Sequence, residues 1–117
     1  MSLVLPIKRK WYDMILSGVK KEEYREIKPY YTIRFMKKLG FKEINSHTAQ
    51  AFINEAESYR GDYNHFPAIN VTFRNGYSNS SPYFVAKCRL AISEGKTEWG
   101  AEQGISYFVL KIDEIIN

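Results

Sequence analysis

Gly18-Val19-Lys20-Lys21-Glu22-Glu23-Tyr24-Arg25 is the stretch in which an expected helix gives way to an expected strand. A glycine at position 18 suits the end of a helix over 11–17, because glycine adopts the left-handed conformation without a Cβ penalty. In a regular strand Glu23 and Arg25 would share one face and Lys20 would lie on the other. Lys20 can meet them only if it lies in the turn after Gly18, or if a β-bulge resets the alternation. We predict one of these two arrangements.

If the three side chains converge, their chemistry allows several roles. Arg25 would hold a phosphate or carboxylate with its planar guanidinium, or it would brace Glu23 in a buried pair. A Lys20 desolvated between aromatic rings would have a lowered pKa and could act as a base or nucleophile. Glu23 could accept a hydrogen bond from a base edge or move a proton. The structural alternative is a set of ion pairs that holds the helix–strand corner together.

The residues before this junction extend the pattern. They are Leu5-Pro6-Ile7-Lys8 and then Trp11-Tyr12-Asp13-Met14-Ile15-Leu16-Ser17. Together with Gly18, Lys20, Glu23 and Arg25 they resemble the ASCH domain, a relative of the PUA RNA-binding domain. The signature of that family is glycine, any residue, lysine, two of any, glutamate, any residue and arginine. The resemblance covers residues 3–27 well, and the C-terminal strands agree with it in pattern only.

The resemblance implies a PUA-like fold with a cleft that binds RNA or a nucleotide-like ligand. The residues we expect to line this cleft are Lys8, Gly18, Lys20, Glu23, Tyr24, Arg25, Tyr30, Glu98 and Trp99. Some members of the family look like amidohydrolases of acetylated cytidine, and others resemble ribonucleases. Lys20 and Glu23 would then be catalytic. Because Glu23 stands where those amidohydrolases look to have a threonine, a hydrolase of a modified nucleoside or of RNA is the alternative, and binding without turnover is the first hypothesis.

The charge of the chain is uneven along its length. Its 117 residues predict one domain, 1–117, with one hydrophobic core and a net charge of +4. Residues 1–42 hold 11 Lys and Arg against 4 Asp and Glu, whereas residues 43–117 hold 6 against 9. A basic first part interleaved with aromatic residues is typical of a nucleic-acid surface. It is equally compatible with a helix that presents a solvated lysine face.

Several other classes of site lack a signal. His47 and His65 are isolated, and Cys88 is the single cysteine, so we expect no metal, no cofactor and no internal disulfide. No apolar stretch is long enough to cross a membrane, and the first six residues lack the layout of a signal peptide. We therefore expect a cytoplasmic protein without a membrane partner.

The periodicity along the chain favours an α+β fold. A first strand over 3–7 would lie at a sheet edge, because Pro6 lacks a backbone donor. A helical insertion over about 29–61 is expected to hold two helices, one ending at Gly40 and one capped by Ser46. Alternating strands follow at 69–73, 84–92 and 107–112, with a hairpin signal at 75–76. We expect these strands to form a small mixed β-barrel, the PUA-like pseudobarrel, with Trp99 either plugging its end or stacking on a base.

Overall fold

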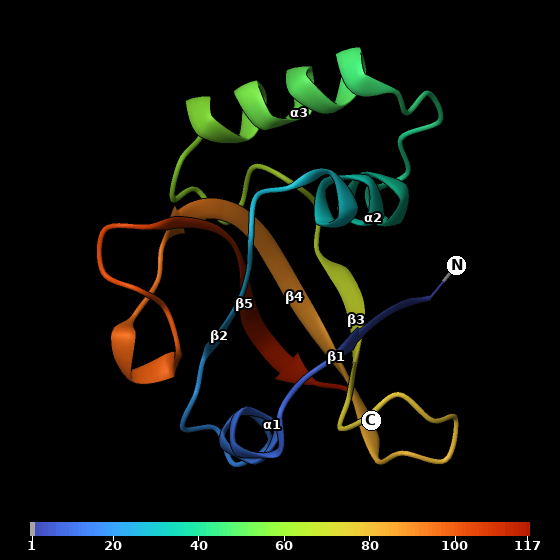
Figure 1. Cartoon of the computed structure of the whole chain (residues 1–117), viewed down its shortest axis with the longest axis vertical. Helices are drawn as coiled ribbons and strands as arrows, with labels where there is room; N and C mark the ends of the chain where they lie inside the picture. Colours follow the sequence, from blue (N-terminus) through green and yellow to red (C-terminus); the bar gives the residue numbers. More distant parts are fainter. Residues whose placement is uncertain (1) are drawn as a thin grey trace.

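The computed structural model describes residues 2–117 and shows an α+β fold around one curled sheet (Figure 1). The strands are β1 (Leu3–Pro6), β2 (Glu22–Arg25), β3 (Ile69–Arg74), β4 (Tyr83–Glu94) and β5 (Ser106–Ile115). The α-helices are α1 (Arg9–Leu16), α2 (Pro29–Leu39) and α3 (Ser46–Ser58), and a 3-10 turn, η1, spans Thr97–Trp99. The predicted α+β class is confirmed.

The sheet is a half-barrel that stays open on one side. Its strand order is β1-β3-β4-β5-β2, with β1 parallel to β3 and all other neighbours antiparallel. The position of Pro6 on an edge strand is therefore confirmed. The expected closure of the barrel is not found, because no described residue pairs β1 with β2. Both edge strands have only four residues, so few backbone N–H and C=O groups are available for hydrogen bonds across the gap.

Helices cover the two ends of the curled sheet (Figure 1). On the side of α2 and α3, the rings of Phe35 and Phe52 lie 5.2 and 6.2 Å from the ring of Phe108 on β5. On the side of α1, the ring of Tyr12 lies 5.0 Å from that of Phe84 on β4. All five rings are buried, so one aromatic-rich core joins the helices to the sheet.

The helix boundaries agree with the sequence signals in most places. Pro29 occupies the first turn of α2, and α2 ends at Gly40 as predicted. The cap of α3 is a correction, because Asn45 and not Ser46 takes that position. The Asn45 side chain accepts a hydrogen bond from the Thr48 amide at 2.9 Å, and the Thr48 hydroxyl accepts one from the Asn45 amide at 2.9 Å. Asparagine and serine are about equally good caps, so residue type alone did not separate the two.

This capping box gives a direct test of the boundary. We expect Asn45→Ala to lower the free energy of unfolding by about 1 kcal/mol, because it leaves the Thr48 amide without its acceptor. Ser46→Ala is the matched control and should change stability by less than about 0.5 kcal/mol. Urea unfolding of both variants measures the difference, and equal losses would contradict the assignment.

Candidate functional site

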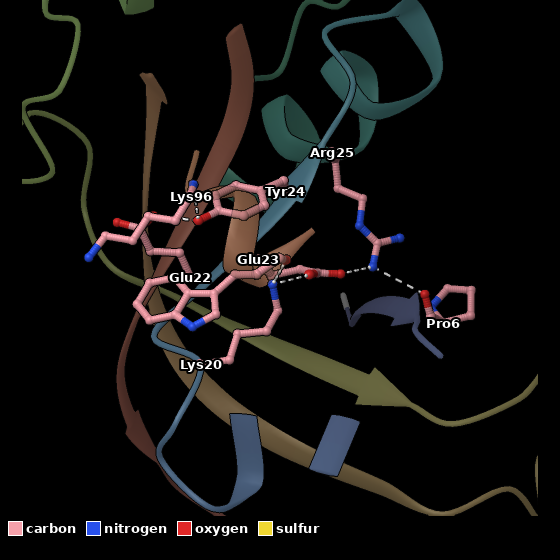
Figure 2. A network of polar contacts seen from close by, with 8 residues as sticks. Pro6, Lys20, Glu22, Glu23, Tyr24, Arg25 and Lys96 are labelled. Atoms are coloured by element: carbon pink, nitrogen blue, oxygen red, sulfur yellow. Dashed lines mark hydrogen bonds and ion pairs between the residues drawn. The ribbon is translucent and has the colours of Figure 1, made fainter. Parts of the chain in front are cut away.

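Lys20 lies in the turn between α1 and β2, which is the first of the two predicted arrangements. Gly18 has a φ of 83°, a left-handed conformation that lets the chain leave the helix. The Lys20 amide then donates to the carbonyl of Met14 at 2.9 Å. β2 begins only at Glu22, so the strand alternation does not apply to Lys20. Its side chain consequently lies on the same side as Glu23 (Figure 2).

The Lys20 amine is fully enclosed. Its Nζ donates to the backbone carbonyl of Trp99 at 2.6 Å and lies 3.2 Å from Glu23 Oε1. It also lies 4.7 Å from the ring centre of Tyr24 and 5.0 Å from that of Trp11, which are cation–π distances. The side chain has no exposed surface. This desolvation lowers the pKa of Lys20, while the Glu23 carboxylate acts in the opposite direction.

Arg25 connects the second oxygen of Glu23 to the opposite edge of the sheet. Its Nη2 donates to Glu23 Oε2 at 2.6 Å and to the carbonyl of Pro6 at 3.1 Å (Figure 2). Pro6 ends β1 and Arg25 ends β2, so this side chain bridges the two edge strands that do not pair. The side chains of Glu23 and Arg25 are 9% and 11% exposed. Lys20, Glu23 and Arg25 therefore converge, and Arg25 braces Glu23 in a buried pair, which is one of the roles expected for it.

A cavity of about 550 Å³ lies beside this bridge. The residues that line it are Pro6, Ile7, Lys8, Arg9, Trp11, Glu23, Arg25, Asn75, Gly76 and Tyr77. Three cationic side chains thus face one carboxylate, and that carboxylate already contacts Lys20 and Arg25. The cavity therefore has a positive balance of charge and two aromatic side chains in its wall.

The structure brings only part of the predicted lining to this cavity. Lys8, Glu23 and Arg25 line it, whereas Lys20 lies behind its wall. Gly18 borders a different, smaller hollow near the C-terminal strand. Tyr30 is exposed on α2, where the Arg34 guanidinium lies 5.3 Å from its ring centre.

Tyr24, Glu98 and Trp99 do not line the cavity, and of these three Tyr24 and Trp99 support the site. The Tyr24 hydroxyl donates to Glu22 at 2.7 Å and accepts from the Lys96 amide at 3.0 Å, and burial raises the pKa of this hydroxyl. A Cβ at Gly95 would lie 2.6 Å from the Tyr24 ring, so the loop after β4 packs tightly here. Glu98 is exposed on η1. Trp99 is half-buried, and its backbone carbonyl accepts the hydrogen bond from Lys20. The expected plug and the expected stacking platform are both roles of its ring, whereas this contact involves only its backbone.

Sequence reasoning missed the loop that completes the cavity. Asn75, Gly76 and Tyr77 follow β3, and the parallel pairing of β1 with β3 sets this loop next to the end of β1. The Asn-Gly pair was a signal for a turn, but it carried no information on which strand would lie beside that turn. A tyrosine directly after the turn was the one available hint.

Other kinds of site have no support in the described chain. Residues 2–117 hold no group of three or more His, Cys, Asp or Glu side chains placed to bind a metal ion. No helix in the same range has the length and apolar character needed to cross a bilayer.

The buried triad of Lys20, Glu23 and Arg25 gives a prediction on stability. We expect Glu23→Gln to lower the free energy of unfolding by about 3 kcal/mol, because it leaves two buried cations without their shared anion. Glu26→Gln, whose side chain is 72% exposed, should cost less than about 0.5 kcal/mol. Urea unfolding measures both.

A second variant tests the coupling within this triad. Adding Lys20→Met to Glu23→Gln removes one of the two stranded cations, so the double variant should lose less stability than the sum of its single changes. Strict additivity would show that the two side chains do not interact as the distances indicate.

Comparison with protein-family models, with curated proteins and with solved structures gives no match for this chain.

Proposed function

We propose that this protein binds RNA or a nucleotide-like ligand in the cavity between the ends of β1, β2 and β3. The observation that carries the proposal is the make-up of the cavity wall, in which Lys8, Arg9 and Arg25 occur together with Trp11 and Tyr77. Cations that contact phosphates and rings that stack on bases are the two components of single-strand recognition.

The electrostatics of the wall favour an anion. Glu23 is the single carboxylate there, and it is shared between Lys20 and Arg25 in a buried group with a net charge of +1. Lys8 and Arg9 add two exposed cations at the start of α1. Arg9 pairs with Asp13, but both side chains are more than half exposed, so a phosphate could compete for that contact.

The family resemblance supports the same proposal. Three of the four signature residues, Lys20, Glu23 and Arg25, form one contiguous group, and two of them border the cavity. The curled sheet is compatible with a PUA-like pseudobarrel. We propose on this basis that the chain is an ASCH-type, PUA-like domain.

A hydrolase remains the alternative, and one observation favours it. Burial lowers the pKa of Lys20, which is a property of catalytic lysines. Against it, the Lys20 amine donates to the Trp99 carbonyl and has no surface open to a substrate. Catalysis by this amine would require the loop after β4 to move, whereas binding requires no rearrangement.

Binding can be tested through the charges at the start of α1. We expect wild-type protein to bind short single-stranded RNA with an affinity that falls with salt. The double variant Lys8→Ala, Arg9→Ala should bind about 10-fold more weakly, and its slope of log affinity against log salt should be shallower by about 1.4, because about 0.7 is lost per phosphate contact. Fluorescence anisotropy over a salt series measures both quantities.

The matched control removes the same net charge elsewhere. Lys37 and Lys42 are exposed and do not line the cavity, so Lys37→Ala, Lys42→Ala should reduce affinity far less. Equal losses in the two double variants would mean that RNA responds to overall charge and not to this cavity. No binding by the wild type at low salt would refute the proposed function.

A further inference from the structure

Tyr77 is the more exposed of the two aromatic side chains at the cavity. It lies in the loop between β3 and β4, it is 90% exposed, and it still contributes to the cavity lining. Within residues 2–117 its ring contacts no other aromatic ring and no cation. Most other tyrosines in this part of the chain have such a contact, for example Tyr12, Tyr31 and Tyr59. The fold therefore gives no packing reason for an aromatic residue at position 77.

The loop around Tyr77 holds its shape without this ring. The Asn75 amide donates to the Pro82 carbonyl at 2.9 Å and closes the loop at its base. Near its tip, the Ser81 amide donates to the Ser78 carbonyl at 3.0 Å, and the Ser81 hydroxyl accepts from the Ser78 amide at 3.2 Å. Because backbone and serine hydrogen bonds set the loop conformation, Tyr77 is presented at the cavity without being needed for folding.

The other aromatic residue of the wall is already in use. The ammonium groups of Lys10 and Lys20 lie 4.6 and 5.0 Å from the ring centre of Trp11. A base that stacked on Trp11 would have to compete with these cations, one of which is buried. Among the described residues no such cation lies over Tyr77, so of the two rings at the cavity only the Tyr77 ring has a face free for stacking.

We infer that Tyr77 stacks on an unpaired base of the ligand while Lys8, Arg9 and Arg25 contact its phosphates. This inference rests on the proposed function and adds the class of ligand. A base inside a duplex has both faces covered by its neighbours, so an aromatic side chain can stack only on a base that is single-stranded or at an end. The side-chain carboxamide of Asn75 makes no hydrogen bond within the described residues. Asn75 lines the same wall, so this carboxamide is available to the edge of that base.

The experiment compares three ligands with the same phosphates per strand. They are a short single-stranded adenosine oligomer, the same oligomer lacking its bases, and a duplex of the oligomer with its complement. We expect wild-type protein to bind the single strand about 10-fold more tightly than the abasic strand, and more tightly than the duplex. Fluorescence competition at one fixed salt concentration measures the three affinities.

Variants then assign this preference to one ring. Tyr77→Ala should lose about 10-fold in affinity for the single strand and change less than about 2-fold toward the abasic strand, whereas Tyr77→Phe should keep the preference. Tyr83→Ala is the control, because Tyr83 is on the same hairpin and half exposed but does not line the cavity. Unchanged thermal unfolding shows that each variant is folded, which the exposure of Tyr77 leads us to expect.

The outcomes separate this inference from the proposed function. If wild-type protein binds none of the ligands, the proposed function fails and the inference fails with it. If it binds single and abasic strands equally, or if Tyr77→Ala retains the preference for bases, the phosphate site stands and the role of Tyr77 is refuted. Equal losses in Tyr77→Ala and Tyr83→Ala would also refute it, because the effect would then not belong to the cavity.

Discussion

The Glu23 carboxylate is the contact on which this end of the molecule depends. Each of its oxygens meets a different cation, Lys20 on one side and Arg25 on the other, and all three side chains are almost entirely buried. A buried charge without a partner is strongly unfavourable, so none of the three could hold its place alone. Through these partners the carboxylate connects the turn after α1, the loop that contains Trp99 and the end of β1.

The same contact explains why the cavity lies where it does. A closed barrel would satisfy the edges of β1 and β2 with backbone hydrogen bonds and would leave no gap between them. In this sheet the Arg25 guanidinium spans part of the gap and reaches the carbonyl of Pro6. The cavity occupies the neighbouring space, so the incomplete pairing of the sheet and the candidate binding site are two aspects of one feature.

Local signals in the sequence predicted much of this structure. Pro29 and Gly40 bracket α2, and the alternation around Phe73 and Phe84 gives the strands of the central hairpin. The junction after Gly18 predicted the convergence of Lys20 with Glu23 once the turn was considered. These features depend on residues close in the chain, whose geometry follows from side-chain type and spacing.

Two features depend on contacts between distant segments and could not be predicted. The parallel pairing of β1 with β3 brings position 77 to the site, and nothing in the alternation of either strand specifies its neighbour. The acceptor for Lys20 is the backbone carbonyl of Trp99. Every residue carries such a carbonyl, so the residue type at position 99 does not predict this contact and indicates only roles for the ring.

The environment of Lys20 also bears on the choice between binding and catalysis. A lysine that acts on a substrate needs its amine at the surface of a cavity, with a lone pair that can be freed. Here the amine has a charged acceptor, a carbonyl acceptor and two aromatic rings around it, which together stabilise the protonated form that burial disfavours. This arrangement makes Lys20 a fixed positive charge behind the wall. Because it holds one oxygen of Glu23, the carboxylate does not cancel Arg25 completely, and the wall keeps the positive balance that an anionic ligand requires.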